Sequence, residues 1–330
     1  MLVETDEGLY CPKGHFYIDP WGAVARAVIT HAHGDHARPG SDAYLCASPC
    51  RPLLARRLEP GTTIEALRYG EARRIGEVTV SLHPAGHILG SAQVRLEGRE
   101  GVWVVSGDYK RAPDPTCEPF QPQPCDTFVT ESTFGLPIFR WDPTEAVIAD
   151  LFEWWEANRA AGLASIVFCY TLGKAQRLLA ELSRLTDRRV LVHGAMSGMT
   201  ELYREAGVPM LPTEVLVERR GREPLAGELV LAPLSARGTA WMRRLGEFSD
   251  AFVSGTMRVR GLRRQRNVDR GFVLSDHADW PALLQTVRET GASRVLTTHG
   301  YPEPLARYLA GRGLATGVIR SAWEGEAAST

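Results

Sequence analysis

Apolar and polar positions follow two different patterns along this chain. In the first 135 residues, short apolar runs alternate with Gly, Pro and polar turns, a pattern that predicts strands. One helix, with apolar residues at helical spacing, is expected over residues 49–58. The expected strands span residues 16–18, 25–29, 43–46, 78–82, 93–96, 102–105 and 127–130. The first part of the chain is therefore expected to be rich in β-structure.

From about residue 143 the pattern changes to helices that alternate with apolar strands. Such alternation predicts a parallel α/β region. The expected helices span residues 144–159, 174–185, 280–290 and 304–311, and the strands span 165–169, 189–192, 272–274 and 294–297. The change of pattern predicts two modules with a boundary near residues 132–142.

Composition narrows the class of protein. The chain has 330 residues, 44% of them hydrophobic and 23% charged, which is typical of a globular protein and excludes a disordered or fibrous chain. No apolar run approaches the roughly 18 residues of a membrane span, so an integral membrane protein is not expected. The start, MLVETDEGLY, lacks the basic and apolar stretches of a signal peptide, so we expect a cytoplasmic protein.

A cluster of metal-ligand residues follows the strand expected over residues 25–29. His31, His33, Asp35 and His36 lie in the motif HAHGDH, on a loop where their side chains can converge. Neutral imidazoles and a carboxylate suit Zn²⁺, Mn²⁺ or Fe²⁺. A single metal would leave one or two of these ligands unused, so the spacing favours two metals, as in binuclear hydrolases. The alternative is a polar turn with coincidental histidines.

Three further residues of ligand type follow other apolar strands. His87 lies in PAGHILGS, Asp108 in SGDYKR and His299 in TTHGYP, each next to a glycine. Any one of these would ordinarily be a polar turn residue. Together with the HAHGDH motif they predict one site assembled from several strand ends.

The order of these motifs resembles the metallo-β-lactamase fold. Asp19, the HAHGDH motif, His87 and Asp108 occur in the order of that fold, an αββα sandwich with a binuclear site at one edge. Glu131 in TESTFG, His277 in SDHADW and His299 in TTHG are similar to the motifs of its β-CASP nuclease branch. The resemblance implies an α/β protein with metallo-β-lactamase segments 1–135 and 272–330 and an inserted α/β β-CASP domain over 136–271. Within this branch, the sequence most resembles the bacterial DNA-ligase-associated exonucleases.

The resemblance also implies a role for each motif residue. It assigns His31, His33 and His87 to one zinc and Asp35, His36 and His299 to the other, with Asp108 as the bridge. Asp19 would accept a hydrogen bond from the other N–H of a ligand imidazole. His277, oriented by Glu131, would donate a proton to the leaving oxygen. Two metals would activate the attacking water and clamp the phosphate oxygens. Asp35 and Asp108 thereby belong to the catalytic set. Mn²⁺ is the alternative to Zn²⁺.

The expected insertion carries an excess of positive charge. Residues 136–271 hold 20 Arg and Lys against 16 Asp and Glu, although the whole chain has a net charge of −1. The excess concentrates in RVRGLRRQRNVDR, residues 258–270, where arginines can contact phosphates and stack on bases. A solvated charged loop is the alternative. The candidate phosphate contacts are Arg258, Arg263, Arg264 and Arg266, together with Lys174 at the start of an expected helix and Ser254 and Thr256 in the segment VSGTM.

The predicted activity is a two-metal phosphodiesterase whose partner is nucleic acid. We favour a DNA exonuclease that acts on single-stranded ends in repair and leaves 5′-phosphates; a DNA ligase or helicase partner is implied by the resemblance alone. His299 favours the alternative, an RNA-processing nuclease of the mRNA 3′-end or ribonuclease J type, because DNA-acting eukaryotic members carry an aliphatic residue there. A small-molecule metallo-hydrolase would leave Glu131 and His277 unexplained. An inactive scaffold would lack ligands that this chain retains.

Overall fold

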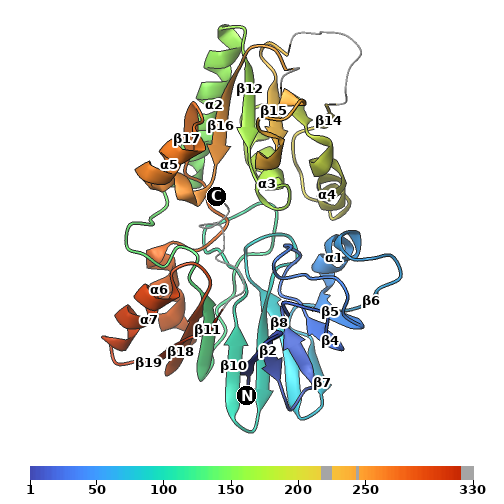
Figure 1. Ribbon diagram of the computed structural model, residues 1–330, viewed down its shortest axis with the longest axis vertical. Coiled ribbons are helices and arrows are strands. Elements are labelled where there is room, and N and C mark those ends of the chain that lie inside the picture. Colours follow the sequence, from blue (N-terminus) through green and yellow to red (C-terminus); the bar gives the residue numbers. More distant parts are fainter. Residues whose placement is uncertain (217–224, 243–244, 321–330) are drawn as a thin grey trace. The chain divides into compact units, whose positions relative to one another are not determined.

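The computed structural model describes residues 1–216, 225–242 and 245–320 (Figure 1). It has two compact units, of which unit 1 comprises Met1–Arg140 and His277–Thr330 and unit 2 comprises Trp141–Asp276. The domain boundaries expected after residues 135 and 271 lie five residues before these junctions. Parts of the expected segments, residues 217–224, 243–244 and 321–330, lie outside the described residues.

Among the described residues, the first sheet of unit 1 has six strands in chain order. Its first three strands are antiparallel neighbours, and the remaining pairings are parallel. The strands are β1 (Val3–Thr5), β2 (Gly8–Cys11), β3 (Phe16–Ile18), β4 (Arg26–Val28), β5 (Ala43–Ala47) and β6 (Thr63–Leu67). The parallel strands β3 and β4 therefore end at the same edge, just before Asp19 and the HAHGDH loop.

The second sheet of unit 1 runs in the order β19-β18-β11-β10-β9-β8-β7 within the described chain. Strands β10, β11, β18 and β19 are parallel, whereas β7 to β10 form an antiparallel meander. The strands are β7 (Ala72–Ile75), β8 (Val78–Pro84), β9 (Ala92–Gly98), β10 (Gly101–Val105), β11 (Thr127–Glu131), β18 (Arg294–Thr298) and β19 (Ala315–Val318). Strand β18 reaches this sheet from a distant part of the sequence.

The two sheets of unit 1 share one apolar core. Val28 and Leu45 of the first sheet pack in the same buried cluster as Val94 of the second. On the other face of the second sheet, Phe128 packs with Leu283 of α6, as expected for a sheet that is buried on both faces. Figure 1 shows α6 and α7 beside β18 and β19. The helices are η1 (Ser48–Cys50), α1 (Arg51–Arg57), α6 (Trp280–Thr290) and α7 (Pro302–Ala310).

Helix α6 shows how local sequence fixes an element that lies next to His277. Asp279 caps its start, because its side chain accepts a hydrogen bond from the backbone N–H of Ala282 at 3.0 Å. Pro281 occupies the first turn, where no backbone N–H is needed. Gly291 ends the helix in the left-handed conformation that glycine adopts readily.

Unit 2 contains a parallel sheet in the order β14-β13-β15-β12-β16-β17 within its described residues. Val167 of β12 packs into one apolar cluster, and its neighbour Ile166 packs into another. The sheet is thus buried on both faces, as parallel sheets usually are. The elements are α2 (Thr144–Ala160), β12 (Ala164–Phe168), α3 (Lys174–Leu182), β13 (Val190–Val192), α4 (Gly194–Glu205), β14 (Thr213–Val215), β15 (Leu229–Ala232), η2 (Leu234–Ala236), β16 (Phe248–Val253), η4 (Gly255–Arg258), α5 (Arg260–Arg266) and β17 (Arg270–Phe272).

The chain is therefore a mixed α/β protein with several sheets. Among the described residues, no helix combines the length and apolar character that a membrane crossing needs. Several elements were absent from the sequence prediction, including β15, β16, α4 and α5. Helix α4 begins at Gly194 and contains Gly198, two residues that disfavour a helix, although Met196, Thr200 and Tyr203 are buried at helical spacing. Helix α5 has no buried residue and so lacks an apolar face.

Candidate metal centre

Loops at the strand ends of unit 1 bring the predicted ligands together. His31, His87 and Asp108 each lie three residues beyond the end of β4, β8 and β10. His299 follows β18 directly, and Glu131 is the last residue of β11. Because both sheets contribute, residues far apart in the sequence meet at one edge of the unit.

Three histidines and one aspartate form one close group of possible metal ligands. The His33 Nδ1 atom lies 3.0 Å from His31 Nε2 and 3.1 Å from His87 Nε2. These nitrogens and a carboxylate oxygen of Asp108 all lie within 4.8 Å of one another. Tetrahedral zinc ligands, at about 2.0–2.1 Å from the metal, have comparable separations. The four residues therefore have the donor set and spacing of a metal site.

Asp108 lies at the centre of the cluster. Its Oδ2 atom is 3.5 Å from Nε2 of His31 and also 3.5 Å from Nε2 of His36. The same oxygen is 3.7 Å from His87 Nε2 and 3.9 Å from His277 Nδ1. One carboxylate thus faces both the close group and the remaining histidines, which is the position a bridging ligand requires.

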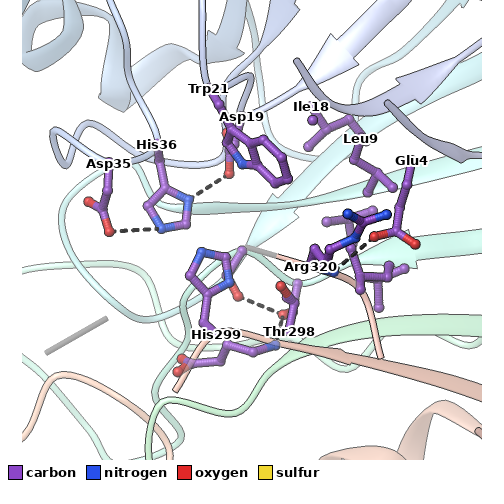
Figure 2. Close-up of a pocket in the computed structure, with 17 residues that line it drawn as sticks. Glu4, Leu9, Ile18, Asp19, Trp21, Asp35, His36, Thr298, His299 and Arg320 are labelled. Atoms are coloured by element: carbon purple, nitrogen blue, oxygen red, sulfur yellow. Dashed lines mark hydrogen bonds and ion pairs between the residues drawn. The ribbon is translucent and has the colours of Figure 1, made fainter. Parts of the chain in front are cut away.

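His36 is held by an aspartate behind it (Figure 2). Asp19 Oδ2 lies 2.7 Å from His36 Nδ1 and accepts a 2.5 Å hydrogen bond from the Thr30 hydroxyl. This contact directs His36 Nε2 toward Asp35 Oδ2, 3.7 Å away, and toward Asp108. A carboxylate that holds the other ring nitrogen in this way is the usual support of a metal-ligating histidine.

His299 lies next to His36 in the cluster. Its ring stacks on that of His36, with 5.2 Å between the centroids, as Figure 2 shows. Its backbone has a φ of +58°, and Asp19 has +45°; non-glycine residues in this region are strained and often lie at functional sites. The next residue, Gly300, must be glycine, because a Cβ there would lie 2.4 Å from the Thr133 Cα.

Two buried nitrogens of this cluster lack a hydrogen-bond partner among the described residues. They are Nε2 of His36 and Nδ1 of His299. A buried polar atom without a partner is costly, and native structures rarely keep one without a ligand, water or ion. The unpaired nitrogens, together with Asp35 and Asp108, therefore fit a bound divalent cation. Asp35, His36 and His299 are more loosely grouped than the first four residues.

The cluster strongly perturbs its own ionisation. Burial and the nearby His36 ring hold the pKa of His31 well below its usual range, and the same two causes lower the pKa of His299. Burial would also lower the pKa of His36, but Asp108, Asp35 and Asp19 outweigh it and hold that pKa well above its usual range. The rings of His31 and His299 thus favour the neutral form that a metal binds, whereas His36 favours its protonated form in the metal-free chain and would release that proton on binding a metal.

His277 and Glu131 form a separate pair beside Asp108. His277 Nδ1 lies 3.0 Å from Glu131 Oε2 and 3.2 Å from its Oε1, and both residues are buried. Glu131 is fixed in turn by the backbone N–H of Tyr109, which donates to Oε1 at 2.7 Å. A buried carboxylate that orients an imidazole is the arrangement of a general acid or base.

Two supporting residues escaped the sequence analysis. The backbone N–H of Thr30 donates to Asp19 at 2.8 Å, and the Thr30 hydroxyl also lies 3.1 Å from His31 Nδ1. The Arg57 Nε atom donates to the carbonyl of Ala32 at 2.6 Å, within the HAHGDH loop. A Cβ at Gly34 would lie 3.0 Å from that guanidinium. The small residue inside the motif was the only signal that another side chain crosses the loop.

The predicted phosphate contacts have different environments in unit 2. Lys174 is fully buried and lies 2.9 Å from Asp276, so it has a structural partner and is not at the surface. Ser254 and Thr256 are also buried, and the Ser254 hydroxyl caps η4 by accepting from the Thr256 N–H.

The predicted arginines lie on or next to α5. Arg263 and Arg264 are exposed, whereas Arg266 is partly covered and lies over the ring of Phe252 at 5.0 Å. Arg258 pairs with Asp142 at 2.9 Å. The exposed members can therefore meet a phosphate without leaving a buried partner.

Sequence comparison identifies relatives of the chain among known proteins. The chain matches no family model. It is 31% identical over 314 residues to a probable DNA ligase from Opitutus terrae, which covers 94% of this chain and 30% of that protein. It is 31% identical over 123 residues to the 5′ exonuclease Apollo from Gallus gallus, covering 34% of this chain and 27% of the relative. With an RNase J-like protein from Methanocaldococcus jannaschii it shares 28% identity over 212 residues, 55% of this chain and 50% of the relative.

These relatives are named as a probable DNA ligase, an exonuclease and an RNase J-like protein. The chain belongs to the β-CASP branch of the metallo-β-lactamase fold. The match to the probable DNA ligase runs over nearly the whole chain. The chain nevertheless spans less than a third of that ligase and of the Apollo exonuclease, and half of the RNase J-like protein.

Proposed function

We propose that the chain is a metal-dependent phosphodiesterase that degrades nucleic acid, and that its substrate is DNA. The observation that carries this proposal is the convergence of two different chemical groups around Asp108. One is the set of metal-type ligands, and the other is the His277–Glu131 pair, 3.0 Å apart. Phosphodiester cleavage needs both an activated water and a proton for the leaving oxygen.

Two Zn²⁺ ions are the cofactors we assign. His31, His33 and His87 would hold one ion; Asp35, His36 and His299 would hold the other, with Asp108 between them and Asp19 behind His36. When bound, such a pair of ions supplies the attacking hydroxide and neutralises phosphate oxygens. A site of imidazoles and carboxylates also accepts Mn²⁺.

The side chains of the protein perform the remaining steps. Glu131 holds His277 through Nδ1, so Nε2 carries the proton that we assign to the leaving 3′ oxygen. Departure of that oxygen breaks the bond between phosphorus and the 3′ oxygen and leaves the phosphate on the 5′ oxygen of the downstream nucleotide. The products we expect are therefore 5′-phosphates and 3′-hydroxyls. A small-molecule hydrolase with a good leaving group would not need this pair.

DNA is favoured by the long match to a probable DNA ligase, and an exonuclease acting on single-stranded ends by the 5′ exonuclease relative. The exposed arginines Arg263 and Arg264 would hold the strand, with Arg258 and Arg266 beside them. A role in DNA repair, next to a ligase or helicase, accords with the ligase relative. Unit 1 would be the αββα sandwich, and unit 2 the inserted β-CASP domain.

The test uses purified chain with Zn²⁺ or Mn²⁺ and single-stranded DNA and RNA of matched sequence, each labelled at one end. We expect early release of mononucleotides from one labelled DNA end, with 5′-phosphate products. A product with a 3′-phosphate would contradict the assignment of the leaving oxygen. Cleavage of DNA with all metal removed by chelation would contradict the metal-dependent mechanism.

An RNA-processing nuclease is the second candidate, and His299 is the observation that favours it. This histidine lines the same cavity as Asp35 and His36, and the RNase J-like relative carries the corresponding RNA activity in its name. Degradation of the RNA substrate alone would establish this alternative and exclude the repair function.

A further inference from the structure

A buried cluster of charged residues lies where the chain leaves unit 2 for His277. Lys174 and Arg177, both on α3, contact Asp276 at 2.9 Å and 3.1 Å. The side chains of the three residues are 0%, 2% and 6% exposed. In this cluster, two cations of the chain form ion pairs with one carboxylate of the same chain.

The same two cations also hold the backbone before His277. Lys174 donates to the carbonyl of Leu274 at 2.9 Å, and Arg177 donates to that of Ser275 at 2.7 Å. Three consecutive residues, 274–276, are thus fixed by α3. We call these contacts of Lys174 and Arg177 with residues 274–276 the clamp. His277, the proposed proton donor, is the next residue after Asp276.

Arg177 in addition connects the two passages of the chain between the units. Its second terminal nitrogen donates to the hydroxyl of Thr144 at 2.8 Å, a few residues beyond the first passage at residues 140–141. On the unit 1 side, the Trp280 N–H donates to the carbonyl of Phe139 at 3.1 Å. Both passages are therefore cross-linked by hydrogen bonds, one cross-link within each unit.

We propose that Lys174, Arg177 and Asp276 are positioning residues for His277. By fixing residues 274–276, they restrict the backbone that carries the imidazole, so that His277 keeps its alignment with Glu131 and with the leaving oxygen. The proposal rests on the proposed function. It gives a role to two buried cations within a single turn of α3, where an apolar pair would cost less to bury.

The consequence is a defect that depends on the leaving group. A nucleoside 3′ oxygen needs a proton to depart, whereas p-nitrophenolate departs without one. Misplacement of a proton donor by about 1 Å can reduce a rate by about 10²-fold. A variant in which the clamp is loosened should therefore lose activity on an oligonucleotide and keep it on thymidine 5′-(p-nitrophenyl phosphate).

The experiment compares both substrates for the full chain and for Arg177→Lys, which keeps the charge and loses the planar fork. We expect kcat on the single-stranded oligonucleotide to fall about 10- to 100-fold, with bound metal unchanged and the rate on the nitrophenyl ester within about twofold of the parent. Arg188→Lys is the matched control, because Arg188 forms its ion pair with Glu156 on another part of unit 2.

Thr144 provides a milder pair of variants should Arg177→Lys fail to fold. Thr144→Val removes the hydroxyl that Arg177 contacts and keeps the shape, whereas Thr144→Ser keeps the hydroxyl. We expect the valine variant to show the leaving-group-dependent loss and the serine variant to behave as the parent. Equal losses on both substrates, or no loss on either, would overturn the positioning role. An inactive parent chain on oligonucleotides would instead refute the proposed function.

Discussion

Two clusters of buried polar side chains in this protein differ in one respect. Around Asp108 in unit 1, His36 and His299 each keep a buried nitrogen without a hydrogen-bond partner among the described residues. Around Asp276 in unit 2, two cations form ion pairs with one carboxylate at 2.9 and 3.1 Å, although the Nε atom of Arg177 also lacks a hydrogen-bond partner among the described residues. The unpaired imidazole nitrogen of His36 lies beside two carboxylates, so the cluster around Asp108 has the donors for a cation from outside the chain. The carboxylate of Asp276 already pairs with two cations of the chain, which is the pattern of a structural clamp.

The largest expected effect comes from Asp108, the oxygen donor common to both groups of histidines. Asp108→Asn removes the negative charge between the rings of His31 and His36. We expect bound metal to fall by at least one equivalent per chain and nuclease activity to be lost. Metal analysis of the purified variant, together with a cleavage assay, measures both.

Asp114→Asn is the matched control for this prediction. The side chain of Asp114, also in unit 1, is 3% exposed and pairs with Lys110, whose Nζ atom lies 3.5 Å from the backbone carbonyl oxygen of His87. Its variant should keep the metal content of the parent. If Asp108→Asn retained all of its metal, Asp108 would not be a metal ligand, and the cluster around it would not differ from the one around Asp276 in binding an ion.

A smaller loss is expected for His277, which acts beside the metals and is not assigned as a ligand. His277→Ala removes the proton donor and leaves the groups around His33 in place. We expect a rate reduction of about 10²–10⁴-fold with unchanged metal content. Rate measurements on metal-analysed protein test this, and full activity would exclude His277 as the donor. His193→Ala, in unit 2, is the control.

Lys174 tests the cluster around Asp276, because loss of this side chain should affect the stability of the protein more than substrate binding. Lys174→Ala leaves Asp276 with Arg177 alone in a buried site. We expect destabilisation of about 3 kcal/mol, at the lower end for a broken buried pair. Denaturant unfolding measures it, with the exposed Arg159 as a control whose alanine variant should lie within about 0.5 kcal/mol. Unchanged stability with weakened DNA binding would return Lys174 to the phosphate contacts.

The smallest effect concerns the metal-free protein and its pH dependence. The raised pKa of His36 means that its charged form is stabilised on folding by Asp108, Asp35 and Asp19. This contribution is fully present below the unfolded pKa of about 6.5 and is lost as pH rises through the raised folded pKa. In chelator, unfolding should therefore become easier at alkaline pH for the parent chain. His36→Gln should flatten that decline; an equally steep decline would assign it to another group.

The sequence predicted the parts of the site whose signals are local. The HAHGDH motif and the strand-end positions of His87 and Asp108 can be recognised from a few neighbouring residues. The α6 helix was predicted with its observed bounds because its cap, its proline and its terminal glycine lie in one short segment.

What the sequence could not show were partners that folding brings together. The contact of Lys174 with Leu274 spans 100 residues, so its burial left no local trace. Arg57 reaches the HAHGDH loop from 25 residues away. Strands β15 and β16 were missed because short apolar segments in a parallel sheet have no distinct period, and only pairing with β12 identifies them.

The most direct test of the metal centre is a titration of the metal-free chain with Zn²⁺, in which binding and DNA cleavage are followed together. The account predicts two equivalents bound at the site, no cleavage before metal is added, and cleavage that appears as the His36–His299 side fills. Activity without metal would contradict it, as would two equivalents bound unchanged by Asp108→Asn.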